Sequence, residues 1–390
     1  MQVDEWLSLC LRWLHIIAGA AWIGTSFYFN WLNNNIRPLE EPEERVKGDL
    51  WSIHGGHFYR VVKYTVAPER LPKTLHWFKW EAYVTWLSGF GLLVVVYYID
   101  ANLYLIDPGV RALSVPSAIG IAVGSLLAGW IVYDLLCRSP LIERPIAFVL
   151  VCFALATGAA WGFTEVLGSR AAYIHVGALL GTLMAVNVFR VIIPNQRVAV
   201  AAMSAGKEPE PKPGIDAARR SLHNNYMTLP VLFIMVSNHY PFTFGHEWNW
   251  AVLAAISLIG AGVRHWFNLR GQGEKNVWIL PAATVAIVAL ALVSAPRDDL
   301  RDAEPVAFET VRTIIEQRCL SCHSATPTQE GIDVAPQGMM FDAPEQIVSL
   351  APRINSVVYV SKTMPLGNLT AMTDEERRAI GVWFAQGATR

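Results

Sequence analysis

The chain has 390 residues, a mean hydropathy of +0.32 and a charged fraction of only 16%. Soluble domains carry roughly 25% charged residues, so this composition indicates a membrane protein. The net charge of -1 excludes a generally basic protein that binds nucleic acid, and the five cysteines are too few for a disulfide framework.

Long apolar stretches follow one another over residues 1–296. A helix needs about 20 apolar residues to cross roughly 30 Å of hydrocarbon, at about 1.5 Å per residue. The stretches that meet this requirement cover residues 6–29, 78–99, 115–136, 146–163, 173–193, 226–239, 248–267 and 277–295, the sixth being short and its helix beginning near residue 217. We therefore predict an all-α fold, in which a polytopic bundle of about eight transmembrane helices precedes a small all-α domain.

The connections between these stretches differ in positive charge. The first, third, fifth and seventh contain most of the Lys and Arg residues, among them Arg45, Lys63 and Arg219, whereas the second holds only Arg111 and the fourth only Arg170. Under the positive-inside rule the odd connections lie in the cytoplasm. This pattern predicts a multi-pass protein of a bacterial inner membrane, with the N-terminus and the C-terminal domain in the periplasm.

Histidines recur inside the apolar stretches, where ionisable groups are costly and are candidates for function by default. The charge pattern places His15, His175 and His239 in the outer half of the membrane and His265 near its inner face. Because facing helices of a bundle can hold a haem between histidines, one interpretation is that a pair among these four ligates a haem b. The other interpretation is that each is a hydrogen-bonded core residue.

The first connection contains an unusual segment over residues 51–60. Its paired Gly55 and Gly56 would let the backbone approach a ligand closely. His54, His57 and Arg60 could then donate hydrogen bonds to a planar anion. A turn that exposes two surface histidines explains the same residues equally well.

The end of the chain contains the most specific motif. A short charged linker over residues 297–304 leads to a domain over residues 305–390, whose first and last helices we expect at 305–318 and 373–386. Within it, Cys319 and Cys322 directly precede His323 in a C-x-x-C-H motif, the attachment site of a c-type haem. We predict thioether bonds from both cysteines, with His323 and Met364 as the two axial iron ligands. A zinc site would need two more Cys or His ligands, and none follows His323.

Several polar motifs together resemble one known family. They are Arg12-Trp13-Leu14-His15, His54-Gly55-Gly56, His76-Trp77-Phe78-Lys79-Trp80-Glu81, His175-Val176-Gly177-Ala178, His223-Asn224-Asn225-Tyr226 and Arg264-His265. The family is the membrane-bound urate oxidase, or urate hydroxylase, whose N-terminal multi-helix membrane domain is fused to a C-terminal class I cytochrome c. The likeness covers nearly the whole chain, and the order of the two parts matches.

The resemblance implies an oxidoreductase of purine catabolism. It would convert urate to 5-hydroxyisourate with water as the oxygen source, and it would pass electrons through one covalent haem c to the respiratory chain without making hydrogen peroxide. The implied partners are urate, the lipid bilayer and a downstream electron acceptor, either a soluble cytochrome or a terminal oxidase.

Urate is a planar anion, so its site should combine a cation, amide donors, an apolar slab and a base. The candidate catalytic residues on this basis are His54, His57, Glu81, Asn187, His223, Asn224 and Arg264. Two other functions remain open from the residues alone. One is an electron-transfer protein of the membrane quinol or alcohol dehydrogenase type, and the other is a cytochrome c subunit without enzymatic activity.

Overall fold

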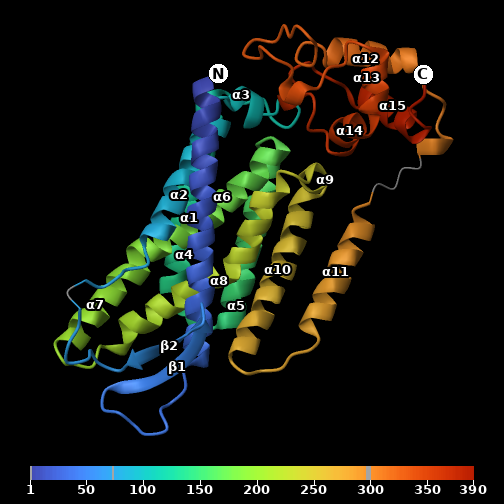
Figure 1. The fold of residues 1–390 in the computed structure, drawn as a ribbon. Coiled ribbons are helices and arrows are strands. Elements are labelled where there is room, and N and C mark those ends of the chain that lie inside the picture. Colours follow the sequence, from blue (N-terminus) through green and yellow to red (C-terminus); the bar gives the residue numbers. More distant parts are fainter. Residues whose placement is uncertain (1, 73, 296–299) are drawn as a thin grey trace.

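The computed structural model describes residues 2–72, 74–295 and 300–390. A bundle of long helices forms its larger part, and a smaller helical domain lies at one end of this bundle, beside the N-terminus (Figure 1). A short β-hairpin lies at the opposite end. We refer below to these two ends as the domain end and the hairpin end.

The bundle consists of helices that are separated by short connections. They are α1 (Gln2–Asn35), α2 (Trp80–Leu92), α4 (Val115–Arg138), α5 (Pro145–Thr164), α6 (Ser169–Asn187), α7 (Ile193–Ser204), α8 (Pro211–Ser237), α10 (Asn249–Gly271) and α11 (Ile279–Val293). One turn of wider helix, η1 (Leu93–Tyr98), extends α2, and another, η3 (Val188–Ile192), joins α6 to α7. The short helices α3 (Ala101–Tyr104) and α9 (Pro241–Phe244) lie at the domain end.

Within the described residues, six helical segments are long and apolar enough to cross a membrane. They are Glu5–Asn35, Trp80–Tyr98, Val115–Arg138, Pro145–Thr164, Ser169–Ser204 and Asn249–Gly271. The other two predicted spans correspond to α8 and α11, which are helices but do not belong to this set: α8 begins with a polar half, and α11 has only 15 residues. The span count of eight therefore stays a prediction.

Helix α6 is the centre of the bundle. In its segment 56% of the most apolar window is buried, against 11–22% in the other five segments. It contacts α2, α4, α5 and α8, and small residues such as Ala171 and Ala172 allow this close packing. A polar side chain on α6 is therefore surrounded by protein, whereas the outer faces of α4, α5 and α11 expose large apolar side chains.

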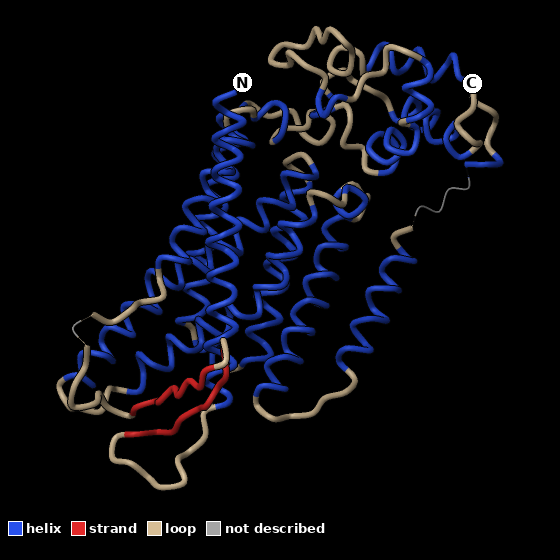
Figure 2. The backbone as a smooth tube through the Cα atoms, in the orientation of Figure 1, coloured by secondary structure: helices blue, strands red, loops and turns tan. Residues whose placement is uncertain are grey.

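The fold is mainly helical, but the all-α prediction needs one correction. Strands β1 (Val46–His54) and β2 (His57–Tyr64) form an antiparallel hairpin within the first connection (Figure 2). Gly55 and Gly56 have φ values of +58° and +78°, as both central residues of a two-residue hairpin turn require. The alternative of a turn with two surface histidines is thus correct, because His54 and His57 are the exposed pair that flanks this turn.

The C-terminal domain surrounds a core of its own. Its main helices are α12 (Phe308–Arg318), α13 (Pro344–Ser349), α14 (Ala351–Asn355) and α15 (Asp374–Ala385), with single turns η4 (Leu300–Asp302), η5 (Pro336–Gly338), η6 (Ser356–Val360) and η7 (Leu366–Asn368). Helices α12 and α15 contact each other through Phe308 and Trp383, whose ring centroids are 5.9 Å apart. The expected capped start of the last helix is confirmed, because Thr373 and Glu376 form a reciprocal capping box.

The predicted linker falls partly outside the described residues, since 297–299 are not among them. The rest of it belongs to the C-terminal domain. Leu300 is buried, and the Nε2 atom of Gln386 donates a 2.9 Å hydrogen bond to the carbonyl of Ala303. Residues 300–304 of the predicted linker thus pack with the C-terminal domain.

Candidate functional site

A cavity of about 810 Å³ lies toward the hairpin end of the bundle. The last turns of α1, the segment from α6 to α7, the first half of α8 and residues 75–78 enclose it. Its polar lining consists mainly of amide side chains and one imidazole, from Asn30, Asn33, His76, Gln196, Asn224 and Asn225. Trp22, Phe29, Trp77 and Phe78 supply flat apolar walls. A planar polar molecule is the ligand that such a lining fits.

Asn225 presents a free donor among these lining residues. Its Oδ1 atom accepts two hydrogen bonds, each 2.9 Å long, from Nε of Arg264 and Nδ2 of Asn268. Because the amide oxygen must face these two donors, the orientation of the Asn225 side chain is fixed. Nδ2 is then the one side-chain atom left to bond a ligand. That buried Nδ2 has no hydrogen-bond partner among the described residues. Since a buried polar atom without a partner is costly, it indicates a place for a ligand acceptor.

Asn268 and Arg264, which bond Asn225, also connect α10 to α1. Asn268 accepts a 2.9 Å hydrogen bond from Asn30, another lining residue. Arg264 lies over the ring of Phe27, with its guanidinium carbon 3.8 Å from the ring centroid. Arg264 was predicted as a catalytic residue. The structure places it behind Asn225, where a buried cation favours an anion in the cavity.

A second network meets the cavity at Asn224. Its Oδ1 accepts a 2.9 Å hydrogen bond from Nδ2 of Asn187, and its own Nδ2 donates to the carbonyl of Met184. Asn187 also donates to the hydroxyl of Tyr133, which lies 2.8 Å from Nδ1 of His223. The predicted residues Asn187, His223 and Asn224 are thus brought together by α6 and α8.

A buried ion pair anchors this second network. Arg220 donates to Oδ1 of Asn187 at 3.0 Å and to Oδ1 of Asp134 at 2.5 Å. The side chains of Arg220 and Asp134 are only 7% and 8% exposed, and Asp134 also pairs with Arg138. Arg220 is not among the residues that the sequence analysis singles out. Arg220 and Asn224 are four residues apart, which is about one helical turn. This spacing is the sequence signal that predicts both side chains on one face of α8.

Glu81, predicted as a catalytic residue, lies beside a histidine that the prediction omitted. Nε2 of His76 is 3.7 Å from Oε1 of Glu81, and Oε2 of Glu81 is buried without a partner among the described residues. His76 lines the cavity, and its ring meets that of Phe78 edge-on at 4.4 Å. A neutral imidazole backed by a carboxylate can accept a proton from a ligand.

The hairpin contributes to the rim of the cavity through a lysine. Nζ of Lys63 donates a 2.8 Å hydrogen bond to Oδ1 of Asn33. Burial, with a smaller contribution from Lys47, lowers the pKa of Lys63. His54 and His57, the predicted catalytic residues of this segment, lie at the exposed turn of the hairpin and do not line the cavity.

The four histidines considered for haem b lie in different surroundings. His175 is fully buried, with Nδ1 2.7 Å from the carbonyl of Ala171 and Nε2 3.2 Å from the hydroxyl of Tyr98. His15 contacts the carbonyl of Thr85 on α2. His239 is exposed after α8, and His265 bonds Tyr226 near the end of α10.

The hydrogen bonds of these histidines favour one of the two interpretations. Both ring nitrogens of His175 are engaged by protein atoms, so iron could reach Nε2 only by displacing the hydroxyl of Tyr98. His15 bonds a carbonyl of α2, and His265 bonds a tyrosine of α8. These contacts favour the interpretation as hydrogen-bonded residues, and the haem b stays a prediction.

The residues of the C-x-x-C-H motif fit a covalently attached haem c. A turn after α12 brings the amides of Cys322 and His323 within 3.1 and 2.9 Å of the carbonyl of Cys319. Nδ1 of His323 lies 3.0 Å from the carbonyl of Met339, which leaves Nε2 for a metal. The partly buried Met364 packs against the apolar core of the same domain, as Cys319 does.

A zinc site suits these cysteines less well than thioethers do. Burial raises the pKa of the Cys319 thiol to about 12, so the free thiol is neutral in its apolar surroundings. A thioether is uncharged and tolerates the same apolar surroundings. The described residues also contain no cluster of three or more His, Cys, Asp or Glu side chains that could hold a metal ion.

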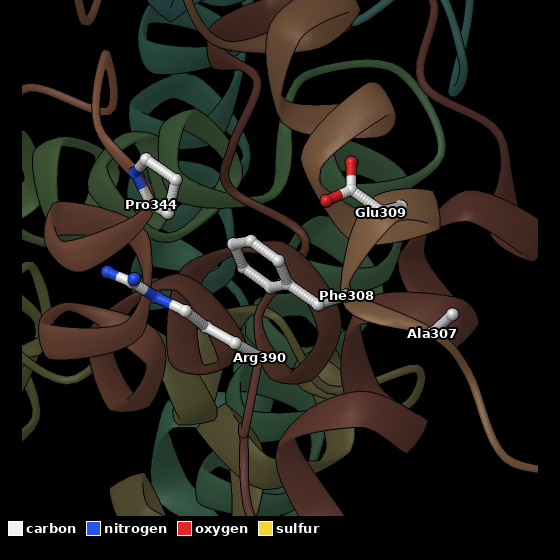
Figure 3. Close-up of a pocket in the computed structure, with 5 residues that line it drawn as sticks. All are labelled: Ala307, Phe308, Glu309, Pro344 and Arg390. Atoms are coloured by element: carbon white, nitrogen blue, oxygen red, sulfur yellow. The ribbon is translucent and has the colours of Figure 1, made fainter.

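The C-terminal domain has a smaller hollow of about 480 Å³ near the start of α12 (Figure 3). Ala307, Phe308, Glu309, Pro344 and Arg390 line it, and the ring of Phe308 occupies the middle of the view. This lining provides neither a thiol, an imidazole nor a thioether. The cavity at the hairpin end is therefore the better candidate for a substrate site.

Comparison with known proteins identifies the family of the chain. No curated protein and no solved structure matches the chain. The sequence model of the urate oxidase N-terminal family matches residues 1–295, which cover the whole bundle and every residue that lines its cavity. The chain therefore belongs to the urate oxidase N-terminal family.

Proposed function

We propose that this protein is a membrane-bound urate oxidase that converts urate to 5-hydroxyisourate and delivers the electrons to a haem c in its own C-terminal domain. The observation that carries the proposal is the unpartnered Nδ2 of Asn225 in an amide-lined cavity, within a chain of the urate oxidase family. Urate is flat, carries several carbonyl oxygens and is an anion at neutral pH. Flat walls, amide donors and the nearby cation of Arg264 match these three properties.

Binding would use the two networks in different ways. Nδ2 of Asn225 donates to a urate oxygen, while Arg264 holds Asn225 and supplies positive charge without needing direct contact. Asn224 is held rigidly by Asn187 and Met184, so its part is to shape the cavity. Trp22, Trp77 and Phe78 are placed to cover the faces of the purine ring.

The reaction adds the hydroxyl of water to C5 of urate and releases two electrons and two protons. His76 is the residue that we expect to take a proton, because it lines the cavity and has a carboxylate partner. Once protonated, its imidazolium would be stabilised by the buried carboxylate of Glu81.

The C-terminal domain provides the exit for the electrons. Cys319 and Cys322 would hold a haem c covalently, and His323 and Met364 would supply ligands to its iron. A haem c, when bound, accepts electrons one at a time, so each urate requires two transfers. Under the positive-inside rule the cavity opens toward the cytoplasm, and the cytochrome domain faces a periplasmic respiratory acceptor.

Anaerobic addition of urate to the purified protein tests the proposal. We expect the absorption bands of haem c to become those of the reduced form, with two haems reduced per urate consumed and no hydrogen peroxide formed. A matched variant, Cys319→Ser with Cys322→Ser, should lose covalent haem on a denaturing gel and show no spectral change. A haem that dithionite reduces and urate does not would reject urate oxidation, and reduction by a quinol instead would favour a quinol dehydrogenase.

A further inference from the structure

The C-terminal domain touches the bundle through the chain segment that contains Met364. Turn η6 contacts α9, and turn η7 contacts α3. Ser361, which follows η6, is only 2% exposed, and Leu105 and Ile106 after α3 are 0% and 4% exposed. We call residues 356–368 the docking segment. Met364 lies between its two contact points, three residues after Ser361 and three before Gly367.

Glycines occupy both points of closest approach. A Cβ atom on Gly245, directly after α9, would overlap the backbone of Ser361. A Cβ atom on Gly367 would lie 2.8 Å from the carbonyl oxygen of Asn102. Backbones therefore meet without intervening side chains at both points, and any larger residue at Gly245 must push the domain away.

A buried arginine holds the docking segment to the rest of its domain. Arg377 on α15 donates hydrogen bonds to the carbonyls of Val358 and Met364 and to Oδ1 of Asn368. The loop of Met364 is therefore fixed to the last helix of the domain as well as to the bundle.

We infer that the docking segment fixes the C-terminal domain on the bundle with the Met364 side of its haem site facing α3 and α9. Electrons from the bundle then enter the domain on the Met364 side. This inference rests on the proposed function for its electron-transfer part, whereas the docking itself does not depend on it.

The substitution Gly245→Leu tests the inference, with Gly245→Ala as a milder form. Gly245 has φ -83° and ψ -4°, which other residues adopt freely, so the change acts through the contact with Ser361. Gly158→Leu and Gly158→Ala are matched controls, because a Cβ atom on Gly158 of α5 meets nothing within 4 Å. All variants are compared as full chains, with equal haem content as the check of folding.

Two measurements separate docking from electron transfer. Amide hydrogen exchange in residues 101–106 and 356–368 should be faster by about tenfold or more in the Gly245 variants, since loss of a contact lowers local protection. The rate of haem c reduction by urate should fall by a similar factor, while reduction by dithionite stays complete. The Gly158 variants should match the parent in both.

Each other outcome has a definite meaning. Parent-like exchange in Gly245→Leu would overturn the docking, and lost protection with an unchanged rate of urate-driven reduction would overturn electron entry on the Met364 side. If Gly245→Leu does not accumulate, Gly245→Ala introduces the same Cβ atom and decides the question. A parent protein whose haem urate never reduces would refute the proposed function instead, and the exchange data would still report on docking.

Discussion

At the scale of single residues, Asn225 is the most informative side chain in the cavity. Its Oδ1 atom already accepts from Arg264 and Asn268, so only Nδ2 can serve a ligand. The variant Asn225→Asp keeps the shape and the acceptor and replaces the donor by a second carboxylate oxygen. Arg264 would pair with this carboxylate, so we expect the fold to tolerate the change.

Urate binding should suffer, because a donor is lost and a negative charge faces an anion. A hydrogen bond to a charged group contributes roughly 1.5–3 kcal/mol, which corresponds to a rise in KM of about 10- to 150-fold. The rate at saturation should change much less, as for loss of ground-state binding. Steady-state kinetics measures both, and Asn35→Asp, outside the cavity lining at the same end, is the control. An unchanged KM would remove Asn225 from the urate site.

The imidazole of His76 should matter through catalysis rather than binding. A positioned general base contributes roughly 100- to 10,000-fold, so His76→Gln should lower kcat at least about 100-fold. Glu81→Gln should have a smaller effect, and the double variant should resemble His76→Gln alone, because Glu81 acts through His76. His57→Gln, at the exposed hairpin turn, is the control. Fully additive effects of the two changes would contradict the pairing.

The candidate residues were predictable to different degrees. Asn187, Asn224 and Arg264 were singled out because a polar group inside an apolar helix is a functional candidate by default, and the structure places them in or next to the cavity lining. Their part in binding urate stays a prediction. Arg220 was missed because charge in a sequence does not reveal burial, and its partner Asp134 lies on another helix. His54 and His57 were overvalued, since their glycines serve the hairpin turn. His76 lies in the connection before α2. No sequence pattern indicates that this connection lines the cavity.

At the scale of secondary-structure elements, α8 connects the two sides of the cavity. Neighbouring residues on it point to different partners: Asn224 bonds Asn187 on α6, and Asn225 bonds Arg264 on α10. Arg220, one turn earlier, bonds Asp134 on α4. The polar side chains Arg220, Asn224 and Asn225 of α8 thus connect it to α4, α6 and α10 around the cavity.

Asp134 pairs with two arginines, so the contributions of a buried and an exposed ion pair to stability can be compared at one carboxylate. Asp134 pairs with the buried Arg220 and with Arg138, whose side chain is 70% exposed. Removal of one partner from a buried pair costs roughly 3–5 kcal/mol, whereas an exposed pair contributes about 0–1 kcal/mol. Arg220→Met should therefore lower the thermal unfolding temperature in detergent markedly, and Arg138→Ala should hardly change it. Equal effects of the two variants would show that burial does not decide the strength of this pair.

Elements were predicted best where one physical rule dominates. Length and apolarity located the helices of the bundle, and the capping residues Thr373 and Glu376 located α15 within one residue. The hairpin was not predicted, because the first connection was considered for its positive charges and its possible ligand contacts. Gly55-Gly56 between two runs rich in β-forming residues is nevertheless a hairpin signal. The docking of the two domains was not predictable, since it depends on backbone contacts at Gly245 and Gly367 that no periodicity records.

At the scale of the whole molecule, the cavity and the predicted haem c lie toward opposite ends of the bundle. Met184 in the cavity lining and Ser169 at the start of α6 are 15 residues apart, which is about 22 Å at 1.5 Å per residue. A second haem midway would shorten the path for electrons. The haem b predicted from the membrane histidines would have this effect, but the two hydrogen bonds of His175 oppose it.

We therefore expect one haem per chain, all of it covalently bound haem c. Both ring nitrogens of His175 bond protein atoms, and His15, His239 and His265 lie on separate parts of the bundle. Pyridine haemochrome analysis of the purified protein distinguishes haem c from extractable haem b. Haem c alone would mean that electrons cross the bundle through side chains such as Trp86 and Phe90, whose stacked rings are 5.4 Å apart, and Tyr97 beyond them. An equimolar haem b would require the hydrogen bonds of His175 to break, or His15 to find another partner, when the cofactor binds.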